Sequence, residues 1–329
     1  MRGKHRITVQ NKRIRYEFKI KRNFTIIRGD SATGKTTLVE MIREYSENGA
    51  DSGIELSCDK DCVVLSGRNW ETQLAGIQDS IVFIDEGNAF VSSEAFAAEI
   101  QKSDNYYVIV TREGLPNLPY SVEEIYGIRN SGKYGSLKQV YNELYHLYGQ
   151  KSYGSPAVPD TVITEDSNSG YQFFQHVCEK KGYSCISAGG KSNIFSVVLQ
   201  QRGRKTLVIA DGAAFGSEME KLMSLMKGNE QILLYLPESF EWLILNSGVV
   251  NDSEVKHILA APYEYIESRE YLSWERYFTW VLIHKTVDSY LKYNKKSLNS
   301  AYLQESIMGQ ILENMKEIDF DMGNHNENG

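Results

Sequence analysis

The chain has 329 residues, of which 41% are hydrophobic, so its length predicts about two domains with sizeable cores. Its formal net charge is −7 at pH 7, so the charge of the whole molecule does not indicate a nucleic-acid-binding protein. The sequence has no signal-peptide pattern and no apolar run of about 18 residues, so we expect a cytoplasmic protein without a membrane span. We expect its four cysteines to be free thiols: Cys58, Cys62, Cys178 and Cys185.

Basic residues gather at the start of the chain, where residues 1–28 contain ten Lys or Arg and one acid, Glu17. Alternation of apolar and polar residues over 5–28 predicts three strands in a meander. The basic residues are either the solvated face of a hairpin or a patch that contacts phosphate groups, and the pattern leaves both open.

Strands alternate with helices in the next part of the chain. Continuous apolar runs at 62–67, 80–86 and 106–113 predict buried parallel strands, with helices over 36–46 and 92–103, the second capped by Ser92 or Ser93. We therefore predict a first domain over residues 1–120. Residues 126–136 read as a loop and 137–149 as a helix, so 121–159 are expected to be a helical connector ending in a proline-containing linker over 150–160.

The alternation restarts after the linker. Strands are predicted over 161–166, 183–189, 205–212 and 231–239, with helices over 168–182, 192–203 and 216–228 between them, which makes a smaller α/β domain over 160–250. Residues 251–317 are expected to be a helical extension and 318–329 a disordered tail. Five residues of the extension have helical spacing and are expected to form its core: Trp274, Tyr277, Phe278, Val281 and Leu282.

The most specific motif is a glycine turn between the third strand and the first helix. Residues 29–36 fit the pattern G-x-x-x-x-G-K-[ST], in which backbone N–H groups and a helix N-terminus surround a nucleotide's phosphates. Lys35 would reach the β- and γ-phosphates, and the Thr36 hydroxyl would bind Mg²⁺. The predicted nucleotide-binding residues are Gly29, Asp30, Ser31, Ala32, Thr33, Gly34, Lys35, Thr36 and Thr37.

A second motif completes this site. Asp85 follows the buried strand IVFI and is placed to bind Mg²⁺, while Glu86 is placed to act as a general base on an attacking water. Arg112, after the next strand, either senses the γ-phosphate or lies on the surface.

These motifs resemble those of P-loop ATPases of the ABC and SMC-head type over about residues 5–115. The resemblance implies an ATP-hydrolysing enzyme with Mg²⁺ as cofactor. Fewer than about 50 residues separate Thr36 from Asp85, which leaves no room for a coiled coil. The segment LSGRN (65–69) resembles the ABC signature but reads better as the end of a strand. A GTPase is the rival interpretation, but the chain lacks Asn-Lys-x-Asp and Asp-x-x-Gly motifs, so we favour ATP.

The smaller domain carries acidic residues at its strand ends. Glu165 ends its first strand and Asp211 its third, so both are expected at one edge of a parallel sheet, where two carboxylates can bind Mg²⁺. Lys191, after Gly189 and Gly190, either contacts phosphate or lies on a solvated turn.

This order of elements resembles a Toprim domain over about residues 160–240, as in the overcoming-lysogenization-defect family of ATPase-nucleases. The resemblance implies that nucleotide state controls a domain that contacts or cleaves nucleic acid, in phage defence or a mobile element, and that the chain can form a homo-oligomer. The family's Asp-x-Asp is Asp211-Gly212-Ala213 here, so one carboxylate is missing, and Asp166, Glu218 or Glu220 would have to replace it. The alternatives are a regulatory switch whose Toprim-like domain binds a partner or ligand without cleavage, and a plain Rossmann-like domain.

Overall fold

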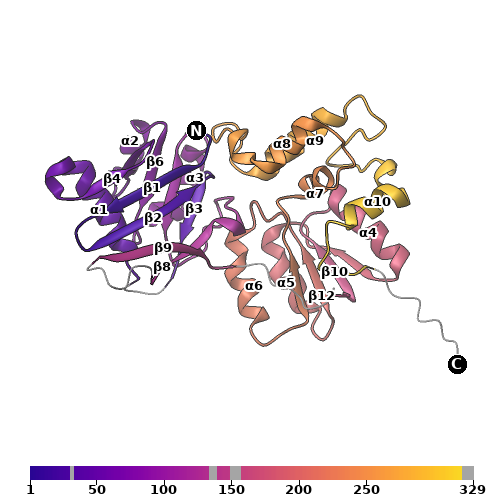
Figure 1. Ribbon diagram of the computed structural model, residues 1–329. Coiled ribbons are helices and arrows are strands. Elements are labelled where there is room, and N and C mark those ends of the chain that lie inside the picture. Colours follow the sequence, from indigo (N-terminus) through magenta and orange to yellow (C-terminus); the bar gives the residue numbers. More distant parts are fainter. Residues whose placement is uncertain (30–32, 133–138, 149–156, 321–329) are drawn as a thin grey trace. The chain divides into compact units, whose positions relative to one another are not determined.

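The chain folds into two compact units in the computed structural model, which describes residues 1–29, 33–132, 139–148 and 157–320. The first unit comprises Met1–Gly149 and Ala261–Ser273, and the second comprises Gln150–Ala260 and Trp274–Gly329. Each has its own β-sheet with helices packed on it, which confirms the predicted α/β class with two units (Figure 1). The boundary differs from the prediction, because residues 121–149 and 261–273 belong to the first unit.

The sheet of the first unit is mixed, with the strand order β4-β1-β2-β9-β8-β3-β7-β6-β5. Strands β8, β3, β7, β6 and β5 run parallel, while β1 pairs antiparallel with β2 and β4. The strands are β1 (His5–Gln10), β2 (Ile14–Ile20), β3 (Phe24–Ile27), β4 (Glu55–Ser57), β5 (Asp61–Val64), β6 (Ser80–Ile84), β7 (Tyr106–Val110), β8 (Ile125–Asn130) and β9 (Val140–His146).

Two predictions for this sheet were wrong. Within the helix expected over 137–149, residues 140–146 form strand β9, which pairs antiparallel with β8 and parallel with β2. The first residues of the expected loop, up to Asn130, belong to β8. Because β8 and β9 lie between β2 and β3, residues 5–28 do not form a meander. The helical connector is therefore replaced, within the described residues, by a pair of strands that completes the first sheet.

Helices cover both faces of the parallel strands. Helix α1 (Lys35–Asn48) lies on one face, and α2 (Trp70–Ala75) and α3 (Glu94–Ile100), the latter capped by Ser93, lie on the other. Residues 65–69, the LSGRN segment, connect β5 to α2. On the α3 face, Phe96 packs edge-on against Tyr107 with ring centroids 5.9 Å apart.

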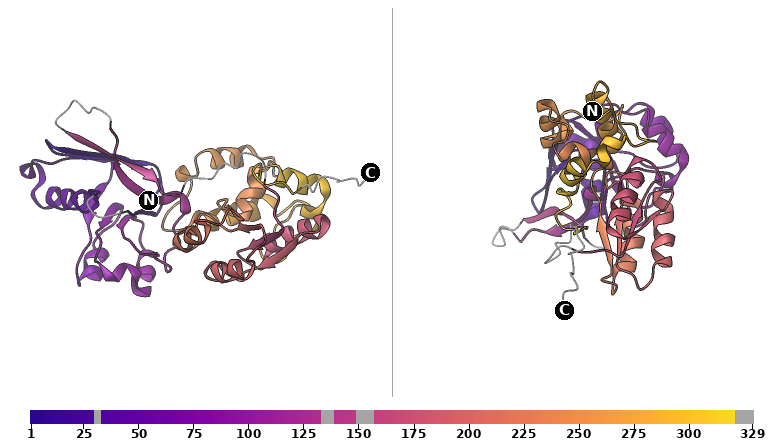
Figure 2. Two further views of the ribbon diagram at one scale, coloured as in Figure 1. Left: turned by 90° about the horizontal axis from the view of Figure 1, so that it is seen from below. Right: turned by 90° about the vertical axis from the view of Figure 1, so that its right-hand side faces the viewer.

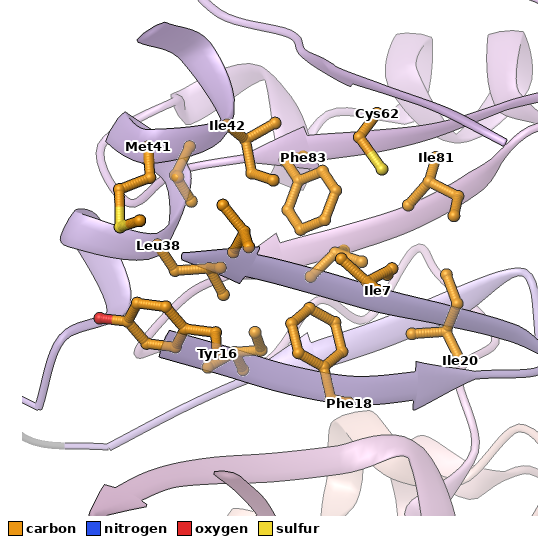
Figure 3. Close-up of a cluster of buried hydrophobic side chains, with 14 of the residues drawn as sticks. Ile7, Tyr16, Phe18, Ile20, Leu38, Met41, Ile42, Cys62, Ile81 and Phe83 are labelled. Carbon is orange, nitrogen blue, oxygen red and sulfur yellow. The ribbon is translucent and has the colours of Figure 1, made fainter. Parts of the chain in front are cut away.

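The core beneath α1 fixes the position of that helix. Figure 3 shows Leu38, Met41 and Ile42 of α1 together with Phe18 and Phe83 of the sheet, and all of these side chains are buried. Burying an aliphatic or aromatic side chain of this size contributes about 1.5–3 kcal/mol. This packing holds the N-terminus of α1, and with it the glycine turn, against the end of β3.

Residues 261–273 return from the second half of the chain to the first unit. Ser268 is 2% exposed, and its hydroxyl donates a 2.9 Å hydrogen bond to the carbonyl oxygen of Asp104. The Asn23 amide donates a 3.0 Å bond to the Ser268 carbonyl oxygen, and Ile266 is also buried. The returning segment (residues 261–273) thus packs beside the start of β3 and the residues that precede β7.

The second unit has four parallel strands in the order β11-β10-β12-β13. They are β10 (Thr161–Thr164), β11 (Ser184–Ser187), β12 (Thr206–Ile209) and β13 (Ile232–Tyr235), and the helices between them are α4 (Ser169–Lys181), α5 (Ile194–Gln200) and α6 (Met219–Met226). The predicted strand–helix alternation of this unit is confirmed.

Four further helices gather at one side of this sheet (Figure 2): α7 (Phe240–Asn246), α8 (Ser253–Ala260), α9 (Trp274–Thr286) and α10 (Glu305–Leu312). The five residues of α9 predicted as core are all buried, which confirms the prediction. The prediction of a disordered tail is wrong for its first residues. Ile318 and Phe320 are buried, and Ile318 forms a β-bridge with Ala157. Residues 321–329 and most of the expected linker lie outside the described residues.

Candidate functional site

The glycine turn lies between the end of β3 and the start of α1, as predicted. Gly29 and Gly34 have φ angles of +131° and +88°, in the range that L-residues with a side chain rarely adopt. A Cβ on Gly34 would also lie 2.6 Å from the hydroxyl of Tyr16. Three predicted binding residues, Asp30, Ser31 and Ala32, lie outside the described residues.

Lys35 connects the two ends of this turn. Its side chain is 5% exposed, and its ammonium group donates hydrogen bonds to the Gly29 carbonyl oxygen at 2.7 Å and to the Thr33 hydroxyl at 3.1 Å. A bound phosphate oxygen would add to these neutral acceptors or replace them. Thr36 is exposed and Thr37 is half-buried in the first turn of the helix.

The N-terminus of α1 has no side-chain cap. Gly34 occupies the capping position, and no acidic residue lies in the first turn. The positive end of the helix dipole is therefore not neutralised by a side chain of the cap or the first turn. Such a helix end favours an anion. Tyr16 donates a 2.8 Å hydrogen bond to the Gly34 carbonyl oxygen, which connects β2 to the turn. The sequence did not indicate this contact, because the motif does not specify partners from other strands.

Asp85 and Glu86 follow β6 directly, at the same edge of the sheet as the glycine turn. Strand β7 lies between β3 and β6, so two strand spacings, about 9–10 Å, separate the two motifs along the sheet. The Asp85 carboxylate accepts the N–H of Glu86 at 2.8 Å, and the Asn88 amide donates to the Asp85 carbonyl oxygen at 2.9 Å. The strand order therefore brings the start of the glycine turn and the Asp85–Glu86 pair to one edge of the sheet.

Arg112 contacts the candidate base. It follows β7, and its Nε lies 2.7 Å from Glu86 Oε1, with both side chains at least one-third exposed. An exposed ion pair contributes only about 1 kcal/mol or less. Replacing this ion pair by a hydrogen bond from Glu86 to a water molecule would therefore cost little free energy. Arg112 thus follows the strand that lies between the two motifs, and it forms an ion pair with Glu86.

A second cluster of functional side chains lies at the carboxyl edge of the second sheet. Glu165 follows β10 and Asp211 follows β12, which pair directly in parallel. The Asp211 N–H donates to Glu165 Oε2 at 3.0 Å, and the Phe240 N–H donates to Asp211 Oδ1 at 3.2 Å. The two predicted carboxylates are therefore neighbours.

Four further residues that the sequence did not indicate join this cluster: Glu241 of α7, and Glu275, Tyr293 and Lys295 of the helical extension. The Tyr293 hydroxyl donates to Glu241 Oε1 at 2.8 Å, and the Lys295 ammonium donates to Glu275 Oε1 at 2.7 Å and lies 3.9 Å from Glu241 Oε1. Tyr293 also bonds to the hydroxyl of Ser169. These residues are up to about 130 positions from Glu165, and no local pattern connects them to it.

The charges in this cluster do not balance. Two nearby ammonium groups, those of Lys191 and Lys295, face five carboxyl groups, those of Glu165, Asp166, Asp211, Glu241 and Glu275. Burial raises the pKa of Glu165 to about 7, with a smaller contribution from the negative charge of Glu275 and an opposing one from the Asp211 N–H. Burial also raises the pKa of Asp211 well above its usual value and raises that of Glu241.

The cluster encloses a small cavity. About 30 Å³ is open between Glu165, Asp166, Asp211, Glu241 and Lys295, which is room for a water molecule or an ion but not for a nucleotide. Within the described residues, no group of three or more His, Cys, Asp or Glu side chains is arranged to hold a metal ion. Glu165 and Asp211 supply two adjacent carboxylates, a donor set of the kind that Mg²⁺ uses in proteins.

The other acidic residues considered as substitutes lie differently. Asp166 lines the cavity, and its carboxylate accepts the Asn168 amide at 3.0 Å. Glu218 is buried and Glu220 is exposed, and neither lines the cavity. Ala213 is 2% exposed and does not line it either. Lys191 donates to the Ala214 carbonyl oxygen at 3.0 Å, and burial lowers its pKa.

The chain matches no protein-family model, and no curated sequence is significantly similar to it. Among the described residues, no helix has the length and apolar character needed to cross a membrane. All four cysteines are free, as predicted.

Proposed function

We propose that this protein binds and hydrolyses ATP at the edge of its first sheet. The observation that carries the proposal is the strand order, which places the glycine turn, Arg112 and the Asp85–Glu86 pair at the ends of three adjacent parallel strands. The uncapped N-terminus of α1 and the buried Lys35 ammonium supply positive potential there. In the bound complex Thr36 and Asp85 would hold Mg²⁺, which would neutralise charge on the phosphates.

Two substitutions test this proposal. Lys35→Ala removes charge-assisted hydrogen bonds, each of about 1.5–3 kcal/mol, so the Kd for Mg-ATP should rise by roughly 10- to 150-fold. Glu86→Gln should leave that Kd nearly unchanged but lower the hydrolysis rate by about 10²–10⁴, as expected for loss of a general base. Glu113→Gln, an exposed neighbour of Arg112, is the matched control. Equal rates of ATP hydrolysis in the wild type and in both variants would refute the proposal.

We further propose that the nucleotide state controls the second unit, and that this unit acts on nucleic acid through Mg²⁺ held by Glu165 and Asp211. The adjacent carboxylates support this, because a cation between them would offset the excess negative charge of the cluster. Bound Mg²⁺ would stabilise charge on a phosphodiester group. Lys295 lines the cavity and is about one-third exposed, and in the proposed complex it would contact a phosphate oxygen.

A second candidate function is a switch that does not cleave. The observations in its favour are the raised pKa of Asp211, the hydrogen bond from the Phe240 N–H to its carboxylate, and Ala213 in place of a further carboxylate. Incubating single- and double-stranded DNA and RNA with Mg²⁺ or Mn²⁺ separates the two. Cleavage that is lost in Glu165→Ala and Asp211→Ala favours the nuclease, and absence of cleavage with either metal favours the switch.

A further inference from the structure

Two of the cysteines lie together where the edge strands of the first sheet are joined. Strands β4 and β5 lie at opposite ends of the strand order, yet only residues 58–60 connect them. Helix α1 contacts both strands, so the sheet curves around this helix. Cys58 is the first residue of the connection, and Cys62 lies in β5, within the buried cluster that Figure 3 shows.

The two thiols are in contact but differ in exposure. Cys62 is 6% exposed, and its side chain forms a hydrogen bond with that of Cys58, which is half-buried. Cys58 also lines an open hollow of about 600 Å³, together with the side chains of Lys4, Arg6 and Arg15. One thiol of the pair therefore meets solvent beside three cationic side chains, while the other is buried against the sheet.

The contact gives the two sulfurs different reactivity. The hydrogen bond from the Cys62 thiol lowers the pKa of Cys58, although burial and the negative charge of Asp59 oppose this effect. The same hydrogen bond, together with burial, raises the pKa of Cys62. Because the thiolate is the form that attacks an oxidant, Cys58 is the sulfur positioned to react first.

We propose that Cys58 and Cys62 are a peroxide-sensitive pair that forms a disulfide bond within the chain. The Cys58 thiolate attacks one oxygen of hydrogen peroxide, the O–O bond breaks, and the other oxygen leaves as hydroxide, which takes a proton from solvent. The Cys62 sulfur then attacks the sulfenic acid on Cys58, and the OH group leaves with the Cys62 proton as a second water. Peroxide is thus reduced to two waters while two thiols are oxidised to one disulfide. The new bond would close the connection between β4 and β5, and the proposal does not depend on the nucleotide site.

The second unit contains a pair for comparison. Cys178 of α4 and Cys185 of β11 also share a hydrogen bond, but Cys178 is 0% exposed. This hydrogen bond and burial raise the pKa of Cys185, the more exposed thiol of the pair. Because that thiol forms less thiolate than Cys58, the second pair should be oxidised at least about tenfold more slowly.

Mass spectrometry of tryptic peptides tests the proposal. Lys60 lies between the two cysteines, so trypsin places them on separate peptides, residues 44–60 and 61–68. The reduced full-length chain is treated with hydrogen peroxide, denatured, alkylated and digested. In the wild type the two peptides should remain joined, and the undigested chain should keep its single mass of 37.4 kDa on a non-reducing gel. Trypsin also separates Cys178 from Cys185, at Lys180, so the same digest compares the rates of the two pairs.

Two variants test the order of the two steps. Cys62→Ala leaves Cys58 without a partner, so dimedone, a reagent for sulfenic acids, should label Cys58. Cys58→Ser should give neither a joined peptide nor a label on Cys62. Circular dichroism checks that both variants are folded. Separate peptides in the oxidised wild type, a bond between two chains, a label on Cys62 in Cys58→Ser, or equal rates for the two pairs would overturn the proposal.

Discussion

Replacing Glu165 with glutamine should make the second unit more stable at neutral and alkaline pH. Glutamine has nearly the same shape, and its side-chain oxygen can still accept the Asp211 N–H that Glu165 accepts at 3.0 Å. It has no charge, however, and the folded protein disfavours the charged form of this carboxyl group, because burial raises the pKa to about 7 from 4.5. Removal of the charge therefore removes a cost of folding.

The magnitude follows from this pKa difference. Between pH 4.5 and pH 7 the folded state binds more protons at Glu165 than the unfolded state, so wild-type stability falls as the pH rises through that window and then levels off. A difference of 2.5 pKa units corresponds to about 3 kcal/mol. Glu165→Gln should thus exceed wild type by about 1 kcal/mol at pH 5 and by about 3 kcal/mol at pH 8.

Urea unfolding followed by tryptophan fluorescence measures this difference. Three of the four tryptophans, Trp242, Trp274 and Trp280, lie in the second unit, so the signal reports mainly on that unit. Glu230→Gln, an exposed carboxyl group just before β13, is the control and should behave as wild type at both pH values. If Glu165→Gln is no more stable than wild type at pH 8, or if its advantage is the same at both pH values, the reasoning about buried charge is refuted.

Three further changes test other parts of the structure. Gly34→Ala should weaken ATP binding at least tenfold and lower the free energy of unfolding by about 1–3 kcal/mol, because its Cβ would meet the Tyr16 hydroxyl at a strained φ; calorimetry and thermal melts measure both. Tyr293→Phe should lower the free energy of unfolding by about 1–3 kcal/mol, since Glu241 loses a buried donor; an unchanged urea midpoint would contradict this. Phe320→Ala should lower it by about 3–5 kcal/mol in the same assay, whereas a truly disordered residue would give no change.

The sequence predicted best those elements whose pattern is local. Strands β6, β7, β10 and β12 are continuous apolar runs, and each was identified to within three residues at either end. The glycine turn and Asp85 were also placed correctly, because a strand that ends in a polar residue determines which edge of a parallel sheet that residue occupies.

The failures come from contacts between distant parts of the chain. Residues 137–149 contain Val140, Leu144 and Leu147 at helical spacing, yet pairing with β2 and β8 makes residues 140–146 a strand in which Leu144 packs against the core. Nothing local indicates that β8 and β9 enter the sheet between β2 and β3. In the same way, Tyr293 and Lys295 reach Glu241 and Glu275 only through the packing of the helical extension.

The returning segment has a practical consequence for dividing the protein. The chain passes between the two units three times, at residues 149–150, 260–261 and 273–274. A gene fragment that stops at any point before residue 261 would leave Asn23 and the Asp104 carbonyl oxygen without the bonds that Ser268 makes to them. Neither half can therefore be expressed intact as one uninterrupted stretch of sequence, and a separate first unit would need residues 261–273 supplied through a short artificial connection.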